Sequence, residues 1–101
     1  MSTQSSFEEL INSKIPVLLD FHATWCGPCK TLAPILEQVK QNLGDSVRII
    51  KIDIDKNRSL AEKLNISGVP TLMVYRDGKL LSRKSGVMPL QDIIRMVQSG
   101  A

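Results

Sequence analysis

Both cysteines of this chain lie in one short stretch, residues 25–30, which reads Trp-Cys-Gly-Pro-Cys-Lys. Only two residues separate Cys26 from Cys29. A disulfide across so short a loop removes little entropy from the unfolded chain, so it adds little to stability. We therefore interpret the pair as a dithiol that is oxidised and reduced in use, and not as a structural crosslink.

The size and composition of the chain fit one soluble globular domain spanning residues 1–101. The net charge of +3 comes without a basic cluster, because the longest basic run is Arg83-Lys84. A solvated surface explains this bias better than a nucleic-acid or membrane site does. Residues 1–6 are polar and uncharged, unlike a signal peptide, and no apolar segment is long enough to span a bilayer. We expect a cytoplasmic protein.

A strand–helix–strand pattern surrounds the cysteine pair. Residues 17–21 form a near-continuous apolar run, which is typical of a strand buried on both faces of a sheet. Pro28 suits the first turn of the following helix, and Gly44 marks its end. Residues 47–53 predict the next strand. A unit of this length is a βαβ crossover, so the two strands are expected to be parallel.

A short helix is expected on the N-terminal side of this unit, over residues 7–13. Its start is predicted from a capping box, with Ser6 as the N-cap and Glu9 three residues later. A second short helix, capped by Asn57 or Ser59, is expected after the second strand.

The C-terminal part of the chain predicts a hairpin and a final helix. Strands over residues 71–75 and 80–85 are joined by Asp77-Gly78, a strong hairpin signal. Gly86 predicts a kink or bulge, and Pro89 starts the last helix. The whole order is αβαβαββα, which predicts a mixed sheet with helices on both faces.

The pattern around the cysteines resembles the active-site signature of the thioredoxin family, and the resemblance extends from about Ser6 to the end of the chain in the family's order and spacing. It implies the thioredoxin fold, an α/β single domain with a central mixed sheet flanked by helices on both faces. The matching residues are Asp20, Phe21, Ala23, Trp25, Cys26, Gly27, Pro28, Cys29, Lys30, Ala33, Pro34, Val69, Pro70, Thr71, Gly78 and Gly86.

Two features depart from the family pattern. Thioredoxins usually begin with an extra strand, for which the residues before Phe7 leave little room, so we expect a four-stranded sheet. In the family that first strand lies beside the strand at residues 47–53, so its loss would expose an edge that Arg48 and Lys51 blunt against pairing. The second departure is His22, where the family usually carries an aromatic residue.

The two cysteines are expected to have different roles. Cys26 begins a helix, where free N–H groups and the helix dipole favour its thiolate, the attacking species. Cys29 lies one turn further into the helix and is expected to be the resolving thiol. Gly27 and Pro28 fix the turn between the two sulfurs. The alternative is half of a zinc site, for which the chain offers two cysteines and one histidine where zinc needs four ligands.

Three polar residues near the cysteines are further candidates. Asp20 lies in an apolar strand, where burial is expected to raise its pKa, and the resemblance implies that it takes the proton from Cys29. The alternative is a carboxylate that meets solvent at a strand end. Lys51 matches a family lysine near this aspartate, or else it is a solvated residue on an edge strand. His22 is expected to be a packed residue rather than an acid or base.

A substrate rim is implied around the pair. In the family the bond before Pro70 is cis and faces the cysteines, which would leave nearby backbone free to pair with an extended substrate segment. A trans turn proline is the alternative. Trp25 would form an apolar contact surface with Gly68, Val69 and Gly86, or else it packs as an ordinary core residue.

The resemblance implies a general protein-disulfide reductase that acts as a monomer. Electrons would come from NADPH through thioredoxin reductase, with no cofactor bound to this chain. Clients would include peroxiredoxins, methionine sulfoxide reductases or ribonucleotide reductase. Two alternatives remain: an oxidant or isomerase of an oxidising compartment, and a binding subunit in which redox activity is incidental.

Overall fold

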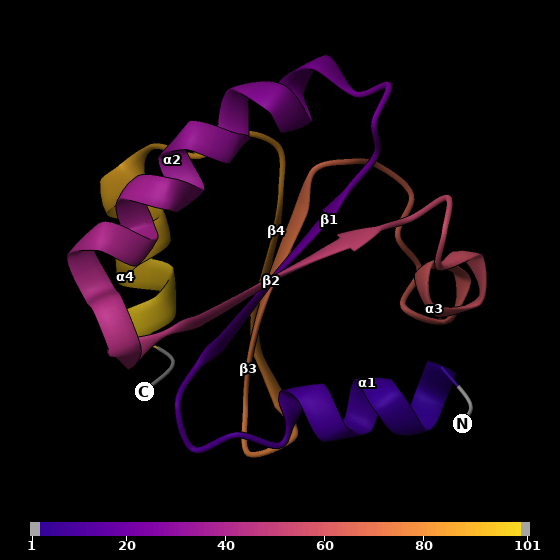
Figure 1. The fold of residues 1–101 in the computed structure, drawn as a ribbon, viewed down its shortest axis with the longest axis horizontal. Coiled ribbons are helices and arrows are strands. Elements are labelled where there is room, and N and C mark those ends of the chain that lie inside the picture. Colours follow the sequence, from indigo (N-terminus) through magenta and orange to yellow (C-terminus); the bar gives the residue numbers. More distant parts are fainter. Residues whose placement is uncertain (1–2, 100–101) are drawn as a thin grey trace.

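Four strands form one mixed sheet in the computed structural model, which describes residues 3–99, with side chains from residue 6 onward (Figure 1). The strand order is β2-β1-β3-β4, with β1 parallel to β2 and antiparallel to β3. For the described part of the chain this confirms the predicted four-stranded mixed sheet. The strands are β1 Val17–His22, β2 Arg48–Asp53, β3 Thr71–Arg76 and β4 Lys79–Ser85.

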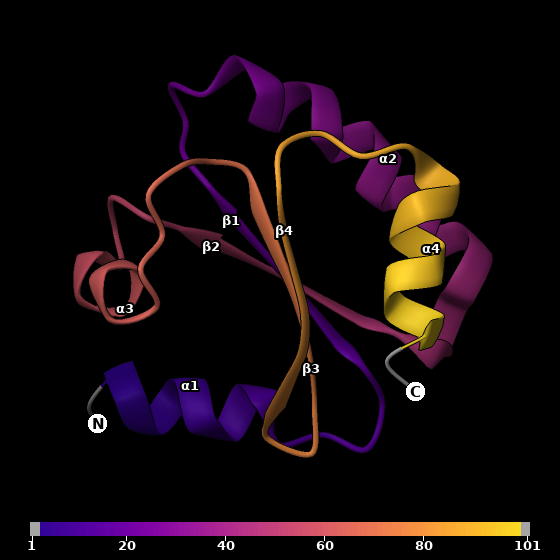
Figure 2. The ribbon, with the colours of Figure 1, turned by 180° about the vertical axis from the view of Figure 1, so that it is seen from behind.

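Helices cover both faces of the sheet, as Figures 1 and 2 show. Helices α2 and α4 pack on one face, where their apolar side chains meet Leu18 of β1 and Leu72 of β3. Helices α1 and α3 lie over the other face, against Leu19 and Phe21 of β1 and Met73 of β3. The helices are α1 Thr3–Ile11, α2 Gly27–Leu43, the 3₁₀ turn η1 Gly44–Ser46, α3 Arg58–Lys63 and α4 Leu90–Ser99.

The central strand β1 explains why its sequence is apolar at nearly every position. Successive side chains alternate between the two faces of a sheet, and each face here is covered by helices. Leu18 therefore enters one apolar cluster while Val17 and Leu19 enter the other, and all three are fully buried. Asp20 is the exception, a carboxylate that is only 4% exposed in this strand.

Helix α2 begins and ends at the residues that the sequence indicates. Cys26 is its N-cap, and Pro28 occupies the first turn, where its missing N–H has no intrahelical partner. At the other end Gly44 has a positive φ of 53° and donates its N–H to the carbonyl of Lys40. A side chain is disfavoured in that conformation, so glycine allows the chain to turn towards β2.

One local prediction was wrong, and the prediction of a kink or bulge at Gly86 was confirmed as a kink. Helix α1 begins at Thr3, so Ser6 lies inside it and does not cap it with Glu9. The helix extends one turn further because residues 3–6 contain no proline or glycine to stop it. The bulge of the hairpin lies between Val74 and Tyr75 rather than at Gly86. Gly86 provides the kink alone, with a φ of 94° just after β4.

The cap of α3 was predicted in part. Asn57 holds the N-cap position and Ser59 lies within the helix. The side chain of Asn57 makes no capping bond and instead donates to the carbonyl of Asp53 at 2.9 Å. Among the helices of residues 3–99, none is long and apolar enough to cross a membrane.

Candidate active site

The two cysteines form a disulfide at the start of α2. Their Cα atoms are 5.3 Å apart, and Cys26 and Cys29 are 4% and 8% exposed. The Sγ of Cys26 accepts a hydrogen bond from the backbone N–H of Cys29 at 3.1 Å. A donor at a helix N-terminus favours negative charge on the acceptor. The structure therefore places Cys26 where its reduced form is stabilised as a thiolate, as expected for the attacking sulfur.

A loop from the other half of the chain lies against the disulfide. The Val69–Pro70 peptide bond is cis, as predicted, and the carbonyl oxygen of Val69 is 3.6 Å from the Sγ of Cys26. Val69 also packs against the small apolar cluster of Ala23, Cys26 and Cys29. The backbone at this point thus flanks the sulfur that a substrate would approach.

Hydrogen bonds hold this loop to β4. The N–H of Gly86 donates to the carbonyl of Pro70 at 2.9 Å. The hydroxyl of Thr71 donates to the carbonyl of Gly68 at 2.7 Å and lies 3.1 Å from the hydroxyl of Ser85. The structure therefore brings Gly68, Val69, Pro70 and Gly86 together beside the cysteines. The sequence pattern gives no sign that Thr71 and Ser85 pair to anchor them.

Trp25 is 67% exposed, so it is not an ordinary core residue. Its indole N–H donates to a carboxylate oxygen of Asp55 at 2.8 Å. Asp55 is placed by Asp53, whose side chain accepts the backbone N–H of Asp55 at 2.8 Å. The indole is thus held in one orientation beside the disulfide while its ring faces solvent. The partner lies thirty positions away, so no local pattern identified Asp55.

Asp20 lies behind the disulfide, at a hollow of about 300 Å³ that Cys29 also lines. Burial raises the pKa of Asp20 above its ordinary value of 3.8, and attraction to His22 and Lys51 offsets part of that effect. Its Oδ1 atom has no hydrogen-bond partner among the described residues. A buried carboxyl without a partner is costly when charged, so Asp20 is suited to hold or accept a proton close to Cys29.

His22 and Lys51 border the same hollow. His22 is half-buried at the end of β1, whereas Lys51 is exposed on β2 in register with Asp20. The structure therefore places both residues within the electrostatic reach of Asp20. Gly27 and Pro28 are exposed at the start of α2, beside the disulfide and open to a substrate.

Few side chains near the cysteines could bind a metal ion. In the part of the chain that the structure describes, no three His, Cys, Asp or Glu side chains gather in a way that could hold a metal ion. Residues 3–99 therefore hold no set of three metal ligands, and the alternative of half a zinc site shared with a second chain stays a prediction.

The thioredoxin family model matches residues 1–99 of the chain. The chain belongs to the thioredoxin family. It is 43% identical over 98 residues to the chloroplastic thioredoxin Y of Oryza sativa, covering 96% of this chain and 58% of the relative. It is 40% identical over 96 residues to the thioredoxin of Bacillus subtilis, covering 95% of this chain and 91% of the relative.

Solved structures agree with this assignment. Oxidised mitochondrial thioredoxin 3 of Saccharomyces cerevisiae superposes with a TM-score of 0.86 at 29% identity, covering 95% of this chain and 89% of that one. Chloroplastic thioredoxin z superposes with a TM-score of 0.85 at 32% identity, covering 99% and 90%. The predicted family and the thioredoxin fold are thereby confirmed, and both support thiol–disulfide exchange at Cys26 and Cys29. The chain spans less than three fifths of the length of the plant thioredoxin Y relatives.

Proposed function

We propose that this thioredoxin is a protein-disulfide reductase. The observation that carries the proposal is the Cys26–Cys29 disulfide at the start of α2, with Cys26 accepting the N–H of Cys29 and facing the carbonyl of Val69. An attacking thiol needs thiolate character and access to its target. The start of α2 favours the thiolate. Trp25 and the loop at Pro70 form the surface on which a target disulfide would reach Cys26.

The reaction begins with the dithiol form. The thiolate of Cys26 attacks one sulfur of a substrate disulfide, forming a mixed disulfide and releasing the other substrate sulfur as a thiolate, which takes up a proton. An extended substrate segment beside Cys26 pairs with the backbone at Val69, as an added strand does. Trp25, Gly68 and Gly86 contact the side chains of that segment.

The second step releases the substrate. Cys29 loses its proton to Asp20, and its thiolate attacks the sulfur of Cys26 in the mixed disulfide. The bond to the substrate breaks, the second substrate thiol leaves, and the Cys26–Cys29 disulfide remains. Asp20 suits this role because its pKa is raised by burial and because it borders the hollow that Cys29 lines. Lys51 and His22 adjust the charge of Asp20 from the rim of the hollow.

The cycle closes when the disulfide is reduced again. We propose thioredoxin reductase as the electron donor, with NADPH as the source of electrons and no cofactor bound to this chain. Clients that form a disulfide in each turnover fit this chemistry, namely peroxiredoxins, methionine sulfoxide reductases and ribonucleotide reductase. The chain is proposed to work as a monomer.

The compartment is proposed to be a reducing one, and the cytoplasm remains the sequence-based prediction. Among the relatives, the plant thioredoxins Y are named as chloroplastic, whereas others come from bacteria. Imaging the protein with a C-terminal tag in its own cell tests this prediction, and accumulation in an organelle or outside the cell contradicts it.

The experiment for the activity is the reduction of insulin by dithiothreitol, followed by turbidity. We expect the chain to accelerate the reduction and Cys26→Ser to abolish the acceleration. Cys29→Ser is expected to trap client proteins as mixed disulfides through Cys26, which identifies them. Absence of acceleration by the folded dithiol form would overturn the proposal.

The reduction potential separates a reductase from an oxidant. Thioredoxins as a class have about −270 mV, against about −120 mV for a strongly oxidising relative of the same fold. We expect a value in the thioredoxin range, measured by equilibration with glutathione or a reference thioredoxin. A potential near the oxidising value would favour the oxidant or isomerase alternative, and a double Cys26→Ser, Cys29→Ser variant that keeps the biological role would favour a binding subunit.

A further inference from the structure

Strand β2 has an open outer edge, because no strand among the described residues pairs with it on the side away from β1. The N–H of Arg48 donates to Pro16 at 3.0 Å, and the N–H of Ile54 donates to His22 at 2.9 Å. In a parallel pair every second residue bonds to the same neighbour. The backbone groups of Ile49 and Lys51 therefore point away from β1.

Side chains close this edge at both ends. The Nζ of Lys40 donates to the carbonyl of Val47 at 3.0 Å, just before the strand begins. The amide of Asn57 donates to the carbonyl of Asp53 at 2.9 Å, where the strand ends. Between these ends, the N–H and C=O groups of Ile49 and Lys51 remain open to a new strand.

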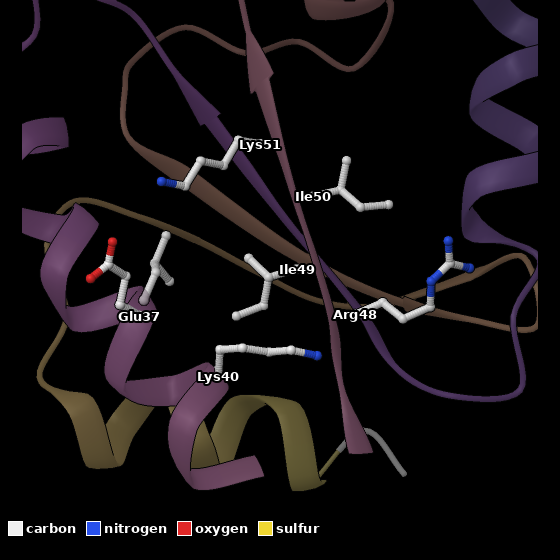
Figure 3. Close-up of a pocket in the computed structure, with 7 residues that line it drawn as sticks. Glu37, Lys40, Arg48, Ile49, Ile50 and Lys51 are labelled. Atoms are coloured by element: carbon white, nitrogen blue, oxygen red, sulfur yellow. The ribbon is translucent and has the colours of Figure 1, made fainter. Parts of the chain in front are cut away.

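A hollow lies on each side of this edge. The larger, of about 490 Å³, extends between β2 and α2, and Figure 3 shows Ile49 and Lys51 on the same side of the strand as Glu37 and Lys40. On the other side, beyond Ile50, lies a hollow of about 220 Å³. Its lining is mixed: the apolar residues include Phe7, Leu10, Ile52 and Leu60, and the polar ones are Ser6, Lys51 and Asn57. Side chains of an added strand alternate between its two faces, so they would enter both hollows.

The charge at this edge is positive. Arg48 and Lys51 are exposed, and neither forms an ion pair with any of the described residues. Glu37 is the carboxylate of the larger hollow, and Lys40 lines the same hollow. With a net charge of +3 on the whole chain, the edge favours carboxylates on an incoming segment.

A second copy of this chain fits the edge poorly. A two-fold antiparallel pairing through the open part of β2 centres on Ile49, Ile50 or Lys51. When the pairing centres on Ile49, Arg48 lies diagonal to Arg48 of the second copy. When it centres on Ile50, Lys51 lies diagonal to Lys51 of the second copy. When it centres on Lys51, the two Lys51 side chains lie directly opposite each other. Like charges at such positions are destabilising.

We propose that the outer edge of β2 binds an extended segment of a partner protein that reads acidic–apolar–apolar–acidic. Opposed residues of two paired strands lie on the same face. The two carboxylates therefore pair with Arg48 and Lys51, and the two apolar residues lie beside Ile49 and Ile50. The pattern is the same in both chain directions, so it fits a parallel or an antiparallel strand. Lys51 also borders the hollow at Asp20, so a docked partner would lie next to the redox site.

The test uses the purified ¹⁵N-labelled chain and a short peptide with a central Glu-Val-Ile-Glu. We expect amide shifts at Ile49, Lys51 and their neighbours in α2, and an affinity that falls as salt rises. A peptide with Lys-Val-Ile-Lys at its centre is expected not to bind, nor is a Glu-Val-Ile-Glu peptide whose β2-facing amides are N-methylated. Equal binding of the lysine peptide, or shifts confined to other surfaces, would overturn the proposal.

Variants of the chain test the same geometry. Arg48→Glu is expected to weaken peptide binding about tenfold, because an attractive cross-strand pair becomes a repulsive one. The matched control is Lys79→Glu, which makes the same charge change on β4 at the opposite edge of the sheet and should bind as the parent does. Ile49→Pro removes an outward N–H without removing a bond to β1, and circular dichroism checks its fold.

Two further readouts separate the outcomes. Sedimentation that shows a dimer, and loss of that dimer in Ile49→Pro, would identify a second copy as the occupant and overturn the proposal. Insulin reduction by Arg48→Glu with dithiothreitol is expected to equal that of the parent. A failure of docking would therefore leave the proposed reductase activity intact, and a failure of that activity would leave docking intact.

Discussion

At the scale of single residues, the protonation of Asp20 affects both the stability of the protein and its proposed reaction. Its carboxyl is buried in the central strand, and its Oδ1 has no hydrogen-bond partner among the described residues. Between pH 3.8 and its raised pKa, the folded chain holds a proton that the unfolded chain releases. The free energy of unfolding therefore falls as pH rises through this interval, and above it the folded protein carries a costly buried charge.

Replacing this carboxyl tests both consequences. At pH values above the raised pKa of Asp20, Asp20→Asn is expected to have a higher free energy of unfolding than the parent. Near pH 3.8 the two proteins should be nearly equal in stability. Urea unfolding measured across this pH range tests both expectations. The same variant is expected to slow release of the mixed disulfide by about 100-fold or more, because general-base help to Cys29 is lost. Asp45→Asn, a change at an exposed carboxylate of η1, is the control. Parallel stability curves for Asp20→Asn and the parent would contradict the account.

Trp25 provides a second test at this scale, since it is the one tryptophan of the chain. Asp55→Ala removes the acceptor of its indole N–H. We expect altered tryptophan fluorescence and a raised KM for a protein substrate, because the ring is no longer held in one orientation. The bond is exposed, so stability should fall by less than about 1 kcal/mol. Lys56→Ala, at the next residue of the turn, should leave both the fluorescence and KM unchanged.

At the scale of elements, the packing of α2 against the sheet holds the start of that helix in place. Leu36 is 1% exposed and lies in the cluster shared with Leu18, Leu72 and Ile93. Leu36→Ala is expected to cost about 2–5 kcal/mol of unfolding free energy. Gln38→Ala, on the exposed side of the same helix, should change stability by less than about 0.5 kcal/mol. Denaturant unfolding measures both, and equal values would contradict the assignment of the helix face.

The elements most fully predicted from the sequence are those fixed by strong local chemistry. The apolar run of β1, the proline and glycine that bound α2, and the Asp77-Gly78 turn each restrict the backbone directly. The predicted start of α1 was wrong, because a capping-box sequence inside a helix looks the same as one at the N-terminus of a helix. The bulge between Val74 and Tyr75 was not predicted, because register depends on cross-strand packing, which the sequence does not display.

The site could be predicted only where residues adjoin in sequence or match a family pattern. Cys26, Cys29 and Asp20 lie on one segment, and Pro70 came from the resemblance. Asp55 and Ser85 were missed, and Thr71 was matched to the family without its bond to Ser85, because these side chains act through partners brought near by folding. A polar side chain in a turn or strand carries no local sign of such a partner.

At the scale of the whole molecule, the redox pair is peripheral to the main core. The two large apolar clusters contain neither cysteine. A disulfide that closes a loop of about four residues stabilises by about 2 kcal/mol in the chain-entropy model. We expect the dithiol form to stay folded, with an unfolding free energy lower by no more than about that amount. Urea melts with and without dithiothreitol measure the difference, and unfolding upon reduction would contradict this view.

The shortness of the unpaired part of the β2 edge has a consequence for solubility. Fibrils of the cross-β kind grow from segments of roughly six or seven residues that stack chain upon chain. Because Lys40 and Asn57 bond the carbonyls of Val47 and Asp53, only Ile49 and Lys51 of this strand have both outward backbone groups open among the described residues, which is too brief a template for such growth. The molecule can therefore keep one strand accessible without seeding its own precipitation.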